Sequence, residues 1–322
     1  MLVRYRWIII SLLIGLNVSA QEIDNATSYK NINTDSYVRF SLDNDYFSGR
    51  DQQYTEGANL EVCNPALKKN PLTWLLINPH YTHTRYGLGL EQAGYTPDNL
   101  HIENQNRDRP YAGTLFFKTF LLATDTVNKQ RWSTTLSTGV IGKIAFGDEI
   151  QDEAHRLLHN VVPPGWEYQI ADDMILNYQV DYEKQLLAFR NILSFEGDAS
   201  ARAGTLNDKA SIGVTALAGY FESPFAQIYR KTGKFHLYMY DRPELDIIGY
   251  DATLEGGVFN HTSPYTISPA DINRTVFINR VGWVASYKRV TLEYFQCYTS
   301  RELGSGPKNN KWGGIQIAVA LR

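Results

Sequence analysis

The chain has 322 residues, of which 43% are hydrophobic, 13% aromatic and 20% charged. Its formal net charge of -3 provides no basic surface of the kind that nucleic-acid binding requires, so we expect no nucleic-acid partner. Only two cysteines occur, Cys63 and Cys297, which excludes a disulfide-rich scaffold and a cysteine-based zinc site. We expect both thiols to be free.

Residues 1–20 have the pattern of a secretory signal peptide. Arg4 and Arg6 precede an apolar run over 7–16, and the small residues Val-Ser-Ala then form a cleavage pattern. The apolar run is too short to cross a bilayer as a helix, and no later window is long and apolar enough to do so. We therefore expect an exported protein, in which residues 21–35 form a short N-terminal periplasmic segment.

Most of the sequence from 36 to 322 alternates apolar and polar residues with the period of two that marks β-strands. In 288–294, for example, valine, leucine and tyrosine alternate with arginine, threonine and glutamate. The pattern predicts twelve strands within one domain, at 36–43, 54–63, 84–93, 111–123, 132–140, 174–188, 189–200, 209–220, 246–258, 274–286, 288–294 and 313–322.

The length of these segments favours an all-β, twelve-stranded antiparallel transmembrane β-barrel. Most of them are about ten residues long or longer, with one apolar face, as in strands that span a membrane. The alternative is a soluble β-sandwich, whose strands usually have about five to six residues. Export, the even number of strands and the 21 tyrosines favour the barrel. The terminal Leu321-Arg322 is the one feature against it, because it is not aromatic.

One segment, at 148–159, lacks the alternation and is rich in helix formers. Its apolar residues Ile150, Ala154, Leu157 and Val161 recur at spacings of three and four, which predicts that they share one side of a helix. Gln151 and His155 are four residues apart and lie on a neighbouring face. The sequence Pro-Pro-Gly ends the segment. We expect one short helix inserted in an extracellular loop of the barrel.

Polar residues end the first predicted strand and begin the second. If Val38, Phe40 and Leu42 face lipid, then Arg39, Ser41, Asp43 and Asp45 face the lumen, whereas Asn44 points outward unless the strand ends or bulges there. By the same argument Thr55, Gly57 and Asn59 face inward in the next strand. Asp45, Thr55 and His155 are therefore expected together at the extracellular mouth. Such a carboxylate, hydroxyl and imidazole can bind a divalent cation and activate water.

The alternative is a purely structural role, in which Asp-Asn-Asp is a solvated turn and His155 is a solvated or packed side chain. Spacing alone does not decide between these interpretations. His80 and His83 could suggest a second metal site, but no third ligand accompanies them, so we reject it.

Several motifs together resemble the outer-membrane lipid A 3'-O-deacylase (LpxR-type) family. The resemblance covers nearly the whole mature chain, and its most specific part is GVIGKIAFGDEIQDEAHRL. The other motifs are Asn44-Asp45, Tyr54-Thr55-Glu56-Gly57, Arg109-Pro110-Tyr111-Ala112-Gly113, and YTSRELGSG followed by GGIQIAVAL.

The resemblance implies a twelve-stranded outer-membrane enzyme that hydrolyses the 3'-linked acyloxyacyl ester of lipid A and depends on Ca2+. It implies that His155 is the general base, that Asn44 stabilises the oxyanion and that Thr55 belongs to the catalytic set. Asp45 matches an adjacent acid, which we assign to the catalytic set and to metal binding. We add Gln151 as a candidate substrate-binding residue.

The sequence departs from the family pattern at three places. A functional glutamate of the family falls on Val161 and a tyrosine on Pro163, although Glu167 or Asp172 could replace the lost carboxylate. A lysine-arginine pair that contacts lipid phosphate has no match near 102–103, and Arg107 and Arg109 could serve instead.

We therefore expect a monomeric hydrolase of lipid A, or lipopolysaccharide, in the outer membrane of a Gram-negative bacterium, surrounded by outer-membrane lipids. The first alternative is an outer-membrane phospholipase, although no serine here stands in a recognisable motif. The second alternative is a non-catalytic barrel or channel with a degenerate site, which the change at Val161 favours.

Overall fold

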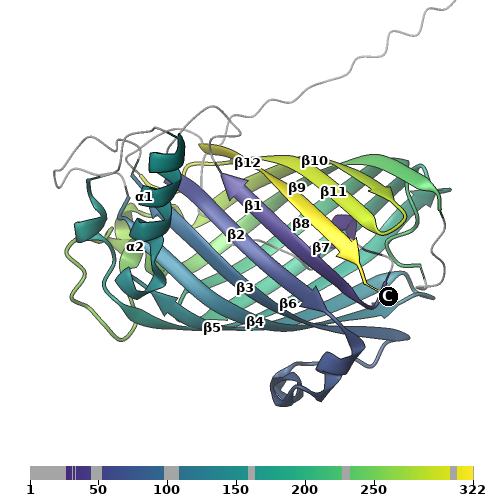
Figure 1. Ribbon diagram of the computed structural model, residues 1–322, viewed down its shortest axis with the longest axis horizontal. Helices are drawn as coiled ribbons and strands as arrows, with labels where there is room; N and C mark the ends of the chain where they lie inside the picture. The colour runs from purple at the N-terminus through teal and green to yellow at the C-terminus, as the bar shows by residue number, and fades with distance from the viewer. Residues whose placement is uncertain are drawn as a thin grey trace, which may run out of the picture.

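The chain folds into a closed barrel, as seen in a computed structural model. The structure describes residues 27–30, 32, 34–44, 53–97, 109–158, 164–226, 233–304 and 310–321, without the side chains of residues 28, 53–56, 153–155, 157 and 158. Within this part of the chain, twelve antiparallel strands follow one another around the barrel, and the first pairs with the last (Figure 1). The strands are β1 Tyr37–Asn44, β2 Gln53–Cys63, β3 His83–Thr96, β4 Ala112–Asp125, β5 Gln130–Ile141, β6 Asp173–Phe189, β7 Leu193–Gly204, β8 Asn207–Tyr220, β9 Phe235–Asp251, β10 Thr275–Tyr287, β11 Val290–Thr299 and β12 Asn310–Ala320. The predicted fold class is confirmed.

Side chains alternate between the two faces of the barrel wall as the sequence predicts. In β1, Arg39, Ser41 and Asp43 are buried, whereas Phe40 is exposed and Val38 is half-buried. A strand that faces lipid on one side and a polar lumen on the other shows this dyad pattern. The apolar outer face therefore needs no protein cover, and the inner face must satisfy its own polar groups.

The ninth strand was predicted in the wrong place. We expected it at 246–258, but β9 begins at Phe235 and ends at Asp251, and the next residues form the short helix α2 Ala252–Glu255. We did not predict the first part of β9 because Pro243 lies in its middle, and proline cannot donate a hydrogen bond to the ladder. The β8–β9 pairing is interrupted beside Pro243 and resumes in the same register at Asp241. The proline is tolerated within the strand because it faces outward at a local break in the ladder.

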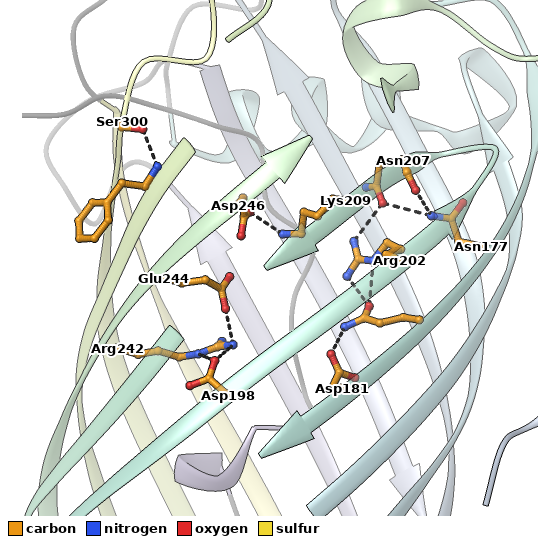
Figure 2. Close-up of polar contacts among 12 residues, drawn as sticks. Asn177, Asp181, Asp198, Arg202, Asn207, Lys209, Arg242, Glu244, Asp246 and Ser300 are labelled. Carbon is orange, nitrogen blue, oxygen red and sulfur yellow. Dashed lines mark hydrogen bonds and ion pairs between the residues drawn. The ribbon is translucent and has the colours of Figure 1, made fainter. Parts of the chain in front are cut away.

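The lumen holds a dense set of ion pairs contributed by inward-facing residues. Arg242 of β9 lies between two carboxylates, 2.9 Å from Asp198 and 2.5 Å from Glu244, and Lys209 lies 2.8 Å from Asp246 (Figure 2). Further buried pairs join Arg39 to Glu61, Lys118 to Glu91, Arg131 to Glu183 and Arg280 to Glu293. These pairs fill the interior with side chains where a porin would hold water.

Replacing Arg242 with methionine is expected to lower the free energy of unfolding by about 3–5 kcal/mol, because two buried carboxylates lose their shared cation. Urea denaturation in detergent measures the change, with the exposed Lys234→Met as the matched control. Equal stability of the two variants would show that the lumenal pairs are solvated rather than buried.

Two segments at one end of the barrel fold into the lumen. Tyr29 of the N-terminal segment stacks on Tyr240 of β9, with ring centroids 3.9 Å apart. From the β8–β9 connection, Phe225 is fully buried beneath the guanidinium of Arg131, which also donates a 2.8 Å hydrogen bond to the Pro224 carbonyl. The described part of this end is therefore packed with side chains.

The helix α1 Gly147–Leu158 stands at the opposite end, between β5 and β6, where the sequence predicted it (Figure 1). The short α2 is a second helix that we did not predict. No helix among the described residues is both long and apolar enough to cross a membrane. We call the end that carries α1 the outer rim and the end where β1 begins the inner rim. The two longest connections, 142–172 and 252–274, lie at the outer rim, as expected for the extracellular side of such a barrel.

Candidate active site at the outer rim

A close contact between two glycines sets the start of α1 against the barrel wall. A Cβ atom added to Gly147 would lie 3.0 Å from the Cα of Gly113 in β4 and 2.9 Å from the Cη2 of Trp166. Only a residue without a side chain allows backbones to approach this closely. The helix also contacts β3. These contacts place α1 over the outer ends of β3 and β4.

The turn before α1 is shaped by Asp172. Its Oδ1 accepts a 3.1 Å hydrogen bond from the backbone N–H of Ile144, and it lies where a side chain on Gly142 would stand. Gly142 has φ +105, a conformation that favours glycine. Asp172, one of the two carboxylates that could replace the one lost at position 161, therefore has a structural role. The other, Glu167, is exposed in the turn of 3-10 helix at Trp166–Tyr168.

A buried tryptophan fixes the helix from the side. The Nε1 of Trp166 donates a 2.6 Å hydrogen bond to the Oε1 of Gln151. Its ring lies 5.2 Å from that of Tyr111, which in turn packs against Gly165. Trp166 thus joins α1 to the β3–β4 connection. We did not predict a role for Trp166, although an aromatic residue directly after a Pro-Pro-Gly turn is a detectable signal.

The buried face of α1 contains the polar Gln151 rather than the apolar Ile150. Ile150 is exposed, whereas Gln151 is only 1% exposed, and the Nε2 of Gln151 has no hydrogen-bond partner among the described residues. Position 155 follows Gln151 by one helical turn on the same face. The backbone of His155 lies in α1, but its side chain is outside the described set. Gln151, predicted to bind substrate, is thus a buried residue with one donor still available.

The end of β1 brings a carboxylate to the same rim. Asp43 is 3% exposed, and its Oδ1 has no hydrogen-bond partner in the described part of the chain. Asn44, the last residue of β1, is half-buried. Asp45 lies outside the described residues. Thr55 sits at a break in the β2–β3 register between Tyr54 and Glu56, and its side chain is not described.

Arg109 is buried and holds three outer connections together. Its guanidinium lies 4.7 Å from the ring centroid of Tyr95, donates a 3.0 Å hydrogen bond to Thr253 and lies 3.6 Å from Glu302. Arg109, which we predicted to contact substrate, is 1% exposed in these contacts. Arg107, its predicted companion, lies outside the described residues.

Comparison with known proteins identifies the family. A family model described as outer membrane protein LpxR matches residues 8–321. The chain belongs to the LpxR family. The structure of LpxR from Salmonella typhimurium matches with a TM-score of 0.72 at 20% identity, covering 89% of this chain and 100% of that one. This likeness shows a shared fold, and with the family match it makes the chain an outer-membrane β-barrel protein.

Other solved barrels match more weakly. The β-domain of the Bordetella autotransporter BrkA gives a TM-score of 0.46 at 10% identity, covering 88% of this chain and 98% of that one. The translocator domain of the autotransporter NalP from Neisseria meningitidis gives 0.44 at 11% identity, covering 89% and 88%. A comparison with curated protein sequences gives no match.

The described residues of this LpxR-family protein contain no cluster of acidic side chains that would mark a calcium site. Calcium binds six to eight oxygen ligands, and no group of three or more histidine, cysteine or acidic residues is gathered within the described ranges. The unpartnered oxygen of Asp43 is a single candidate ligand at the rim. The predicted ligand Asp45 is outside those ranges.

Proposed function

We propose that this LpxR-family protein is a hydrolase that removes the 3'-linked acyloxyacyl group of lipid A in the outer membrane. The position of α1 carries the proposal. The helix is held over the outer ends of β3 and β4 by the Gly113–Gly147 contact and by Trp166. Its face that contains Gln151 and position 155 lies on the same rim as Asn44. A hydrolase of an outer-leaflet lipid needs its polar groups at this height of the barrel.

Each proposed residue has one role in ester hydrolysis. His155 takes a proton from water while the water oxygen attacks the ester carbonyl. Asn44 donates a hydrogen bond to the oxyanion of the tetrahedral intermediate. When the carbon–oxygen bond to the sugar breaks, the leaving alkoxide takes the proton from His155. The products are the free acyloxyacyl acid and a 3'-hydroxyl on the sugar.

Asp45 and Thr55 complete the proposed set. We propose Asp45 as a ligand of Ca2+, which would supply a positive charge near the ester when bound. Thr55 lies at the break in the β2–β3 register, and an irregularity of this kind can re-aim side chains near active sites. The described residues supply no further carboxylate cluster, so the proposed calcium site depends on Asp45 and its neighbours.

The interior of the barrel weighs against the channel alternative. Ion pairs such as Arg280 with Glu293 occupy the lumen, and Tyr29 and Phe225 pack into its inner end. A passive pore needs an open aqueous path, and these side chains occupy part of the space that such a path would need. The phospholipase alternative differs in substrate rather than in fold, so it requires an experiment.

Incubating the purified protein with lipid A and with a glycerophospholipid, each with and without EDTA, separates these alternatives. We expect lipid A to lose its 3'-linked acyl group, the glycerophospholipid to remain intact, and EDTA to stop the reaction until Ca2+ is restored. Cleavage of the glycerophospholipid alone would contradict the substrate assignment. Full activity in EDTA would contradict the calcium assignment.

A further inference from the structure

The connection between β2 and β3, residues 64–82, is a defined structure at the inner rim. It contains two 3-10 helices, η3 Pro65–Lys69 and η4 Pro71–Leu75, and it projects from the barrel wall (Figure 1). The side-chain oxygens of Asn64 and Asn70 cap them by accepting backbone hydrogen bonds of 2.9 and 3.1 Å. A simple barrel turn needs only a few residues, so this elaborate connection calls for a role of its own.

The connection is fastened to the outward-facing side of the wall. Tyr178 of β6 donates a 2.9 Å hydrogen bond to the Leu75 carbonyl and accepts one of 3.0 Å from the N–H of Ile77. Thr134 of β5 donates a 2.8 Å bond to the Ile77 carbonyl. Leu76 is buried against outward-facing side chains of the wall, including Leu121. Because lipid surrounds that side of the barrel, the connection lies at the edge of the bilayer.

The surface that remains free is apolar and flanked by positive charge. Trp74 is 89% exposed, and Leu72, Leu75 and Ile77 are exposed with it. Lys68 and Lys69 are exposed nearby, and no acidic residue occurs between 64 and 82. Tryptophan concentrates at membrane–water interfaces, while lysine reaches from there to phosphate groups.

We propose that the 64–82 connection is an interfacial anchor that inserts Leu72, Trp74 and Leu75 into the inner, periplasmic leaflet. Its partner is glycerophospholipid, whose phosphate groups Lys68 and Lys69 contact. A segment that presents apolar and basic side chains at a bilayer surface binds by both effects together. The attachment to Tyr178 and Thr134 fixes the depth of the anchor and therefore the height of the barrel in the membrane. This anchor is independent of the proposed enzymatic activity.

The tryptophans of the chain provide a matched test. The full-length mature protein and its Trp74→Phe, Trp283→Phe and Trp312→Phe variants are each reconstituted into phosphatidylethanolamine–phosphatidylglycerol vesicles, with or without brominated acyl chains. Subtracting the emission of each variant isolates one tryptophan. Trp283 is exposed on the outward face of β10 and Trp312 is buried, so they provide the lipid-exposed and lipid-shielded references.

We expect brominated lipid to quench Trp74 about as strongly as Trp283 and more than Trp312. Quenching of Trp74 by aqueous iodide but not by brominated lipid would overturn the anchor. Trp74 could instead be protected from both quenchers and lose this protection when the protein is diluted with lipid. This result would indicate a contact between two copies of the chain and would also overturn the anchor. Reversing both charges, with Lys68→Glu and Lys69→Glu, is expected to weaken the lipid quenching of Trp74. Unchanged quenching would overturn the assigned role of the lysines.

Discussion

Replacing His155 with alanine is expected to lower the rate of lipid A deacylation by about 10²–10⁴-fold, the usual contribution of a positioned general base. The rate is measured with purified protein in mixed micelles of detergent and lipid A, by mass spectrometry of the released acid. Added imidazole is expected to restore part of the lost rate, because it can take the proton from water in place of the missing side chain.

His80→Ala is the matched control for this experiment. His80 is exposed in the 64–82 connection at the inner rim, far along the barrel from the proposed site. Its replacement is expected to leave the rate unchanged. An alanine variant at position 155 with the activity of the unmodified protein would remove His155 as the base.

Replacing Gly147 with valine is expected to lower activity by about 10²-fold while the barrel remains folded. A Cβ at this position would lie 3.0 Å from the backbone of Gly113, so α1 must move away from the wall. Misplacing a catalytic group by about 1 Å can cost about this much in rate. Heat-modifiable mobility in electrophoresis verifies that the barrel is intact, and the lipid A assay gives the rate.

Gly233→Val provides the control for added bulk. No atom of the described residues lies within 4 Å of a Cβ added at Gly233, so this variant is expected to keep full activity. If the Gly147→Val variant were as active as the Gly233→Val variant, the close contact of α1 with β4 would have no part in catalysis.

The barrel was predictable from the sequence because the membrane imposes a simple rule on each strand. In β1 the alternation of Phe40 with Arg39 and Ser41 gave the correct inward and outward faces. The rule fails where the outward residue is not a typical strand former. The first half of β9 was not predicted because Pro243 argues against a strand there. The local break in hydrogen bonding that accommodates this proline cannot be read from composition.

The helix at the rim was predictable in position but not in orientation. We placed Ile150 on a shared apolar side, which in a soluble protein would be its buried side. Ile150 is instead exposed and Gln151 is buried. An apolar side chain beside a bilayer needs no protein cover, so the apolar pattern does not report the protein-facing side there. The contact of Gly147 with Gly113 decides the orientation, and it depends on residues far apart in sequence.

The candidate site was predictable only in part, because it also depends on contacts between residues far apart in sequence. The motifs identified β1 and α1 as the elements that carry Asn44 and position 155, and the structure has both elements at the outer rim. The roles of buried residues depend on packing between connections. Arg109 was predicted to bind substrate, whereas its buried contacts with Tyr95 and Glu302 were not predictable from the motif.

The most direct test of the proposed activity is the mass spectrum of lipid A from Gram-negative cells that express this protein. We predict that lipid A shifts to a lower mass by the acyloxyacyl group of the 3' position, and that cells expressing the His155→Ala variant keep lipid A intact. Unmodified lipid A in cells whose outer membrane contains the folded unmodified protein would contradict the account.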